Sequence, residues 1–374
     1  MKIETKLAQI GNRKEQTTGA ISFPVTFSTA FLHPGLGEST GFDYIRTKNP
    51  TRIVLEDAIA DIEGGDQGFA LSSGMAAIHV LFGLFKPGDH IIASFDLYGG
   101  SYRLFEQVWK HYGITCSYVD VRNGEDLRAH LVPETKAIFI ETPSNPMMIT
   151  ADIESMATVA KEQGVLTIVD NTFLSPYYQK PILQGADIVV HSATKYLGGH
   201  NDVLAGLVVT KGKELSERVA FLQNTSGAVL APMDSWLLIR GMKTLSLRME
   251  KHTENARQLV AFLKEYPLVE DVLYAGVGGM ISFRIKDAGM VSPLLKNLKL
   301  ISFAESLGGV ESLLTYPSIQ THADIPREIR ERVGVCDRLL RMSVGIEHVG
   351  DLQEDLDQAL QAAYVAWSKG EEQS

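Results

Sequence analysis

Cysteine is scarce in this sequence, and no apolar run is long enough to cross a membrane. The two cysteines, Cys116 and Cys336, form no C-x-x-C pair and no cluster with histidine. A disulfide framework and a structural zinc site are therefore disfavoured, and we expect two reduced cysteines and no metal site. Residues 1–16 are mixed in charge and lack the apolar segment of a signal peptide. These absences predict a cytoplasmic protein that does not act in a membrane.

Three common cofactor and metal motifs are also absent. The chain contains no G-x-G-x-x-G, no G-x-x-x-x-G-K-[ST] and no H-E-x-x-H, which disfavours a nicotinamide-dependent dehydrogenase. Basic residues are outnumbered, since 35 lysines and arginines stand against 45 aspartates and glutamates and the formal net charge is −10. A broad attraction to nucleic acid or to an anionic membrane is therefore not expected. Any anion that the protein binds must be held by a local site.

What the sequence does contain is a pattern of alternating strands and helices. The chain has 374 residues and is 45% hydrophobic, a size that favours two domains. Short β-branched runs predict strands at 90–94, 137–141, 166–171, 187–191 and 206–210, separated by amphipathic helical segments. Strands that alternate with helices predict a mainly parallel sheet covered on both faces. We expect this domain at 51–240 and a smaller α/β domain at 241–374.

Residues 1–50 read as an irregular arm. Glycine and proline punctuate it, and no helical period lasts more than a turn. Its Phe23, Phe27 and Phe31 would be costly to leave in water. We therefore expect the arm to lie across a neighbouring subunit of a homo-oligomer.

Capping residues and hydrophobic spacing predict the helices and strands of the two domains. One helix is predicted at 53–62, with Thr51 as its candidate N-cap, and another at 153–163, between Asp152 and Gly164. A long helix at 234–266 should end before Pro267 and lead into the second domain. Strands are predicted there at 280–285, 301–304 and 340–346, and a polar tail at 371–374.

Polar residues follow three of the predicted strands and turns. Asp170 closes one strand, the sequence S-A-T-K at 192–195 follows the next, and S-S-G-M at 72–75 forms a turn into a helix. Ligands of an open parallel sheet bind just past the carboxyl ends of its strands. These three clusters are therefore expected to meet in one site.

Together the clusters supply what pyridoxal 5′-phosphate requires. Lys195 would form the Schiff base, because burial and a cationic neighbourhood can make a lysine nucleophilic. Asp170 would hold the pyridine nitrogen protonated. A phosphate could bind backbone N–H groups and hydroxyls, which the sequence offers at Gly74, Met75, Ser192 and Thr194. Taken singly, each residue has an ordinary alternative as a turn, a helix cap or a surface charge, so the interpretation depends on their combination.

The segment S-A-T-K-Y-L-G-G-H at 192–200 resembles the signature of the Cys/Met-metabolism family of PLP enzymes. The resemblance extends from Y-I-R at 44–46 to R-M-S-V-G at 341–345 and includes D-L-Y-G-G at 96–100, E-T-P-S-N-P at 141–146 and S-L-G-G at 306–309. It implies an α/β fold of the aspartate-aminotransferase type (fold type I), with a mainly parallel seven-stranded sheet and a smaller C-terminal α/β domain. It also implies PLP bound covalently to Lys195, and an active dimer that pairs into a tetramer.

The resemblance further implies a role for each matching residue. Tyr98 would stack on the pyridine ring, with its hydroxyl free for proton transfer, and Ser73 would join the phosphate site. Tyr44 and Arg46 would reach the cofactor phosphate of the neighbouring subunit. Asn145 would lie near the phenolic oxygen or the substrate carboxylate, and Arg341 would bind the α-carboxylate. The alternatives are a core position for Tyr98 and a solvated surface pair for Tyr44 and Arg46.

The family catalyses β-elimination, γ-elimination and γ-replacement on small amino-acid substrates. Arg103 resembles the residue that cystathionine-handling members use for a distal carboxylate, and Glu305, before Ser306 in the substrate site, resembles the acidic residue of γ-specific members. Either could instead form an ordinary surface ion pair. Over its whole length the chain resembles the bacterial cystathionine γ-synthases that are also O-acetylhomoserine thiolyases, including E-T-K-L-A-Q-I-G-N-R at 4–13.

This resemblance implies a transferase of methionine biosynthesis and transsulfuration. It would join O-acyl-L-homoserine, with acetyl favoured over succinyl, to L-cysteine to give L-cystathionine, or to sulfide to give homocysteine. The alternatives are a cystathionine γ- or β-lyase and, from another class, a catalytically inactive binding protein on the same fold.

Overall fold

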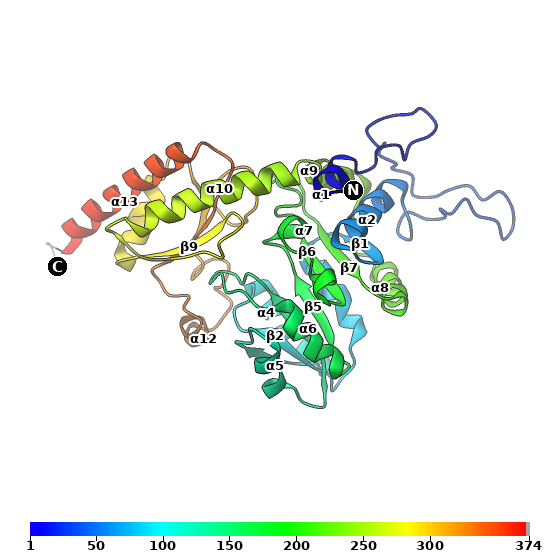
Figure 1. Ribbon diagram of the computed structural model, residues 1–374, viewed down its shortest axis with the longest axis horizontal. Helices are drawn as coiled ribbons and strands as arrows, with labels where there is room; N and C mark the ends of the chain where they lie inside the picture. Colours follow the sequence, from blue (N-terminus) through cyan, green and yellow to red (C-terminus); the bar gives the residue numbers. More distant parts are fainter. Residues whose placement is uncertain (372–374) are drawn as a thin grey trace.

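Two β-sheets organise the chain in a computed structural model that describes residues 1–371 (Figure 1). The larger sheet has seven strands in the order β1-β7-β6-β5-β4-β2-β3. Only β7 runs antiparallel to its neighbours β1 and β6, so the predicted mainly parallel sheet is confirmed. The strands are β1 (Gln67–Leu71), β2 (His90–Ser94), β3 (Thr115–Val119), β4 (Thr135–Glu141), β5 (Leu166–Asp170), β6 (Ile188–Ser192) and β7 (Gly206–Thr210).

The sequence missed two of these strands, β1 and β3. Both lie at the edges of the sheet, and β3 is only partly buried, so its hydrophobic pattern is weak. The helices of this unit are α2 (Pro50–Glu63), α3 (Gly74–Val80), α4 (Gly99–Gln107), α5 (Gly124–His130), α6 (Ile153–Glu162), α7 (Ser175–Tyr178) and α8 (Lys213–Ser226).

Caps decide where these helices begin. The predicted cap of α6 is confirmed, since the Asp152 side chain accepts from the N–H of Ser155. The predicted cap of α2 is wrong. Asn49, not Thr51, is the N-cap, and its side chain accepts from the N–H groups of Thr51 and Arg52. The reason is Pro50, whose fixed backbone angle suits the first helical position and moves the start of the helix toward the N-terminus.

The smaller sheet has five strands in the order β10-β11-β12-β9-β8 and belongs to the C-terminal part of the chain. Its strands are β8 (Val269–Leu273), β9 (Met280–Ile285), β10 (Ser302–Phe303), β11 (Leu313–Thr315) and β12 (Leu339–Ser343). Helices α11 (Val291–Asn297), α12 (Arg327–Arg332) and α13 (Val349–Glu371) accompany it. Of the predicted polar tail, Glu371 ends α13 and residues 372–374 lie outside the described residues.

The single long helix predicted at 234–266 is two helices, α9 (Pro232–Met242) and α10 (Leu245–Lys264). Arg248 explains the break, because its guanidinium reaches back to the carbonyl oxygens of Gly241 at 2.8 Å and Tyr196 at 2.7 Å. A Cβ atom on Gly241 would lie 2.2 Å from the carbonyl oxygen of Gly198. The break therefore packs directly on the segment that follows Lys195, and α10 then crosses to the smaller sheet (Figure 1).

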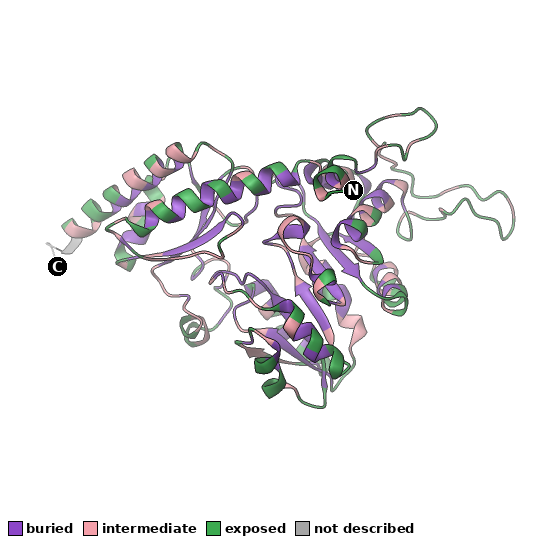
Figure 2. Ribbon diagram, in the orientation of Figure 1, coloured by how far each residue is buried: buried purple, intermediate pink, exposed green. Residues whose placement is uncertain are grey.

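The expectation that residues 1–50 are irregular throughout is wrong. It begins with the short helix α1 (Ile3–Ala8), in which Leu7 is fully buried. A helix of six residues is too short to give a periodic signal. The rest of the segment extends away from the body of the molecule as a largely exposed loop (Figures 1 and 2).

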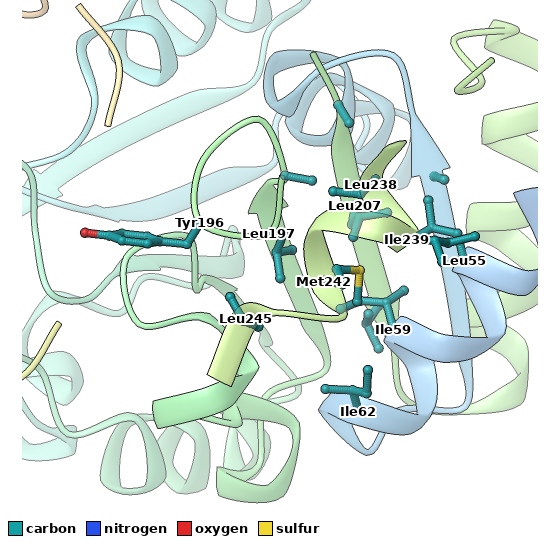
Figure 3. Packing of buried hydrophobic residues seen from close by; sticks show 14 of the residues in the cluster. Leu55, Ile59, Ile62, Tyr196, Leu197, Leu207, Leu238, Ile239, Met242 and Leu245 are labelled. Atoms are coloured by element: carbon teal, nitrogen blue, oxygen red, sulfur yellow. The ribbon is translucent and has the colours of Figure 1, made fainter. Parts of the chain in front are cut away.

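One hydrophobic cluster supports the segment after Lys195. Leu55, Ile59 and Ile62 of α2 pack with residues of β7 and α9 (Figure 3). Tyr196 and Leu197 belong to the same cluster, with their side chains pointing in different directions. The residues that follow Lys195 are thus anchored in the core. Among residues 1–371, no helix is both long and apolar enough to span a membrane.

Candidate active site

A cavity of about 310 Å³ opens beyond the carboxyl ends of β4, β5 and β6 and is closed on its other side by residues of the smaller sheet. The structure brings most of the predicted site residues together in its wall: Ser73, Gly74, Met75, Tyr98, Asn145, Asp170, Ser192, Thr194, Lys195, Glu305, Ser306 and Arg341. Sequence reasoning did not name several other lining residues, among them Glu141, Thr172, Phe173, Leu204 and Thr321.

Lys195 lies in the turn after β6 and extends into this cavity. Its Nζ is 3.1 Å from the Ser306 Oγ. Burial lowers the pKa of the lysine to about 8, and the positive charge of Arg341 adds to this effect while Glu305 opposes it. The amine is therefore far closer to its neutral, nucleophilic form at physiological pH than an ordinary lysine.

Asp170, the last residue of β5, is held by Thr172. The Asp170 Oδ1 accepts from the Thr172 N–H at 3.0 Å and from its hydroxyl at 2.5 Å. The Thr172 Oγ1 also accepts from the N–H of Ser192 at 2.9 Å, which ties the ends of β5 and β6 together. Burial raises the pKa of Asp170, and the two bonds from Thr172 oppose that rise.

Glu141, at the end of β4, is a second buried carboxyl in the cavity wall. Its Oε2 accepts from the N–H of Tyr98 at 2.9 Å, which positions the start of α4. Burial and the nearby charge of Asp170 raise the pKa of Glu141 well above its usual range. Because two adjacent buried carboxyls do not both ionise readily, we expect Glu141 to keep its proton and Asp170 to carry the charge.

The opposite end of the cavity suits an anion. Ser73 caps α3 by accepting from the N–H of Ala76 at 3.0 Å. The N–H groups of Gly74 and Met75 lie in the first turn, where a helix offers them no acceptor. A Cβ atom on Gly74 would come within 2.8 Å of the Ser192 Cβ, so only glycine allows this turn to approach β6 so closely.

Arg341 of β12 is a fully buried cation on the wall formed by the smaller sheet. It donates to the Asn145 Oδ1 at 2.9 Å, to the Thr315 Oγ1 at 3.1 Å and to the Ser306 carbonyl at 3.2 Å. Its hydrogen-bond partners among the described residues are all neutral, and its Nε has no partner there. Burial lowers the pKa of Arg341 to about 10, which leaves it charged at neutral pH. A carboxylate-bearing ligand would complete this site.

Tyr98 lines the cavity and is partly exposed. A Cβ atom on Gly100 would lie 2.4 Å from a carbon of its ring, so the ring folds back over this glycine. The ring thus presents a flat apolar face from the N-cap position of α4.

Three predicted residues lie outside the cavity wall. Arg103 of α4 is half-exposed and forms an ion pair with Asp324 at 2.5 Å. Tyr44 and Arg46 lie on the N-terminal segment, where the Arg46 guanidinium is 3.0 Å from the Asn224 Oδ1. Within one chain, therefore, the arm does not complete the site.

The cavity residues fit a phosphorylated aldehyde cofactor of the pyridine type. They offer a buried, nearly neutral amine at Lys195, a carboxylate at Asp170 for a protonated ring nitrogen, and a first helical turn at Gly74 for a phosphate. Arg341 remains available for the carboxylate of an amino-acid substrate. No group of histidine, cysteine and acidic residues within residues 1–371 could hold a metal ion, and Cys116 and Cys336 are both free thiols.

Comparison with known proteins agrees with this geometry. The model of a family described as Cys/Met metabolism PLP-dependent enzyme matches residues 4–361. Cystathionine gamma-synthase/O-acetylhomoserine (thiol)-lyase of Bacillus subtilis is 62% identical over 358 residues, covering 96% of both chains. Cystathionine beta-lyase of Lactococcus lactis subsp. cremoris is 49% identical over 375 residues, covering 96% of this chain and 99% of that protein.

Solved structures show the same fold. The crystal structure of cystathionine gamma-lyase from Lactobacillus plantarum, complexed with L-serine, is 44% identical. It matches with a TM-score of 0.95 and covers 97% of this chain and 100% of the other. The fold type I architecture expected from the resemblance is thereby confirmed. The relatives include a synthase and two kinds of lyase.

Proposed function

Because the chain belongs to the Cys/Met metabolism PLP-dependent enzymes, we propose that it catalyses a γ-replacement on O-acyl-L-homoserine. L-Cysteine would replace the acyl group to give L-cystathionine, and sulfide would give homocysteine. The observation that carries the choice of reaction is Glu305, an acidic side chain in the cavity wall close enough to influence the charge of Lys195. The relative that is 62% identical, named for both synthase and O-acetylhomoserine activity, supports acetyl as the acyl group.

PLP is the cofactor of this family, bound covalently to a lysine, and we propose Lys195 as that lysine. When bound, it supplies an electron sink that stabilises negative charge on the carbons of the substrate. Asp170 would hold its ring nitrogen, and Ser73, Gly74, Met75, Ser192 and Thr194 would hold its phosphate, with Tyr98 against the ring.

Residues of the chain would bind the substrate and transfer its protons. Arg341 would bind the α-carboxylate of the substrate, with Asn145 and Ser306 beside it. The Lys195 amine, once released by the substrate, would remove the Cα proton, pass it to the bound cofactor and then remove a Cβ proton. The acyloxy group would leave from Cγ as a carboxylate that keeps the electrons of the Cγ–O bond, and the thiolate of cysteine would form the new bond at the same carbon. Lys195 then returns protons to Cβ and Cα.

The effect of Glu305 on Lys195 is the physical argument for the γ-replacement. The negative charge of Glu305 raises the pKa of Lys195, against the effects of burial and Arg341. A lysine that must both take and return protons works best with a pKa near the working pH. Burial and Arg341 weaken the basicity of Lys195 enough for the amine to be partly neutral, while Glu305 keeps it able to hold a proton.

The test is a steady-state comparison of O-acetyl- and O-succinyl-L-homoserine, each with cysteine and with sulfide. We expect cystathionine from the acetyl ester and cysteine, and no turnover or yellow bound cofactor in Lys195→Ala. Failure to form cystathionine, with pyruvate or 2-oxobutyrate released from added cystathionine, would instead identify a β- or γ-lyase. Lack of all these reactions would favour an inactive binding protein, which the joint presence of Lys195, Asp170 and Arg341 argues against.

The remaining expectations stay predictions. They are the division of the chain at residues 50 and 240, the cytoplasmic location, and a homodimer that pairs into a tetramer. Interaction with nucleic acid or membrane is not proposed, in keeping with the net charge of −10.

A further inference from the structure

A buried polar cluster lies next to the ends of β5 and β6, outside the cavity wall. Glu63, the last residue of α2, Asn171 and His191 are all 0% exposed. The Glu63 Oε1 is 2.7 Å from the His191 Nε2 and accepts from the Asn171 Nδ2 at 3.0 Å. One carboxylate oxygen from a helix thus joins two neighbouring strands.

This arrangement is costly for the fold. Burial of a carboxyl disfavours its charge, and the end of a helix is the wrong place for an anion because the macrodipole is negative there. The Glu63 Oε2 and the His191 Nδ1 have no hydrogen-bond partner within residues 1–371. An apolar contact between α2 and the sheet would be less expensive, so packing alone does not account for Glu63.

The neighbours of the cluster in the sequence are the cofactor residues. Asn171 directly follows Asp170, and His191 directly precedes Ser192. Because side chains alternate along a strand, His191 points away from the face on which Ser192 lines the cavity. Fixing Asn171 and His191 therefore fixes the backbone from which Asp170 and Ser192 extend.

Asn171 is held on both of its polar atoms. Its Nδ2 also donates to the Gln179 carbonyl at 2.9 Å, and its Oδ1 accepts from the Gln179 Nε2 at 3.1 Å. The Gln179 Nε2 donates in addition to the carbonyl of Thr142, which follows Glu141 at the end of β4. The network thus reaches the ends of three adjacent strands that carry cavity residues.

We propose that Glu63 is a positioning residue for the cofactor. Through Asn171 and His191 it holds the ends of β5 and β6 at the separation that lets Asp170 meet the ring nitrogen while Lys195 bonds covalently to the same ring. Both attachments are made to one rigid group, so their spacing must be fixed closely. The role depends on the PLP site but not on which reaction the enzyme catalyses.

The experiment compares purified Glu63→Leu and Glu63→Gln with the unaltered enzyme. The dissociation constant of PLP is measured on the apoenzyme, together with the absorbance of the bound cofactor and the Tm of the apoenzyme. In Glu63→Leu the acceptor is lost, and we expect PLP to bind at least about tenfold more weakly. In Glu63→Gln the amide oxygen can accept both bonds, and we expect affinity within about threefold of the unaltered enzyme.

Asp61→Asn is the control on the same helix. The Asp61 carboxylate forms an ion pair with Lys6 at 2.7 Å at the surface, away from the cavity. We expect this variant to lower the Tm of the apoenzyme without changing the affinity for PLP. Asn171→Ala, which removes the link from Glu63 to β5 and both side-chain bonds to Gln179, should also weaken PLP binding and serves if Glu63→Leu does not fold.

The proposal is overturned if PLP binds to Glu63→Leu and Asn171→Ala as tightly as to the unaltered enzyme, whatever their Tm. It is also overturned if Glu63→Gln loses as much affinity as Glu63→Leu, since the hydrogen bonds would then not be the cause. Because none of these measurements uses the acyl-homoserine substrate, they stand apart from the test of the γ-replacement.

Discussion

At the level of single residues, the charges around Lys195 set its reactivity. Burial and Arg341 lower its pKa to about 8, and Glu305 acts in the opposite direction. Asp170 and Glu141 line the same cavity, and of the two Glu141 is expected to be neutral. The two charged residues that shift the pKa of Lys195 are thus the cation Arg341 and the anion Glu305.

The first prediction concerns the pH dependence of cofactor binding by the apoenzyme. Only the neutral amine forms the covalent bond, and a lowered pKa means that this form is present above pH 8 and is lost as the pH falls. The rate of covalent PLP binding should thus level off above pH 8 and fall about tenfold per unit below it. Stopped-flow absorbance measures this rate.

Two variants test the cause of the lowered pKa, because they should shift the midpoint of the pH profile in opposite directions. Arg341→Met removes the cation and should move the midpoint of the pH profile upward, whereas Glu305→Gln removes the anion and should move it downward. A midpoint near the ordinary lysine value of 10.5 in the unaltered apoenzyme would contradict the assignment.

The second prediction concerns Arg103, which Asp324 holds outside the cavity. The family resemblance implies that Arg103 binds the distal carboxylate of cystathionine, which comes from cysteine, and if it does so this ion pair competes with the substrate. An exposed ion pair is worth up to about 1 kcal/mol, so Asp324→Asn should lower the KM for cysteine by up to about fivefold. Sulfide carries no carboxylate, and its KM should not change. Arg103→Leu should raise the KM for cysteine alone, and parallel changes for both nucleophiles would refute this role.

The residues that could be predicted from the sequence differ in kind from those that could not. Lys195, Asp170 and Arg341 were predicted from their residue types and their neighbours in the sequence, and the structure brings all three into one cavity wall. Glu141 could have been found as the third polar residue at a strand end, since its strand was predicted. Asp324 could not, because it lies 221 residues from Arg103 and nothing local indicates the pairing.

At the level of elements, one buried arginine connects α2 to the N-terminal arm. The Arg52 guanidinium donates to the carbonyls of Ile45 at 2.9 Å, Arg46 at 3.0 Å and Thr47 at 3.2 Å. The Asn49 side chain adds a bond to the Thr26 carbonyl at 2.8 Å. The backbone that carries Tyr44 and Arg46 is thus fixed by the first turn of the helix.

The third prediction follows from this connection. Arg52→Met keeps most of the volume but removes every donor, so it should lower the free energy of unfolding by about 3 kcal/mol. It should also make the bonds after Arg46 and Lys48 accessible to trypsin. Urea unfolding and limited proteolysis measure the two effects. Arg52→Lys, which keeps the charge but offers fewer donors, should fall between, and unchanged proteolysis in Arg52→Met would contradict the connection.

Elements were predicted well where hydrophobic period and burial agreed. The strands β2, β7 and β9 match the predicted ranges, because each is a short β-branched or apolar run in the interior of the fold. The break between α9 and α10 was missed because it depends on Arg248 reaching the carbonyl of Gly241, a tertiary contact. The predicted N-cap of α2, Thr51, was wrong because Pro50 suits the first helical position and makes Asn49 the N-cap.

At the level of the whole molecule, the N-terminal arm is the part that a single chain leaves unexplained. Its Leu36, Leu32, Ile21 and Phe27 are strongly exposed although they are apolar. Tyr44 and Arg46 lie at the base of the arm and away from the cavity of their own chain. We therefore retain the prediction that the arm covers a neighbouring subunit and supplies its phosphate site.

The last prediction tests this sharing of residues by mixing two impaired variants. If each site takes Lys195 from one subunit and Arg46 from the other, a mixed dimer of Lys195→Ala and Arg46→Ala has one site with both defects and one intact site. Random exchange of subunits in a two-fold dimer should then restore activity to about a quarter of the sites. The measurement is the rate of cystathionine formation before and after the two proteins are unfolded and refolded together.

Each variant refolded alone is the control, and it should stay impaired. If the mixture is no more active than the sum of the two controls, Arg46 does not act on the neighbouring subunit. The exposed arm would then need a different explanation.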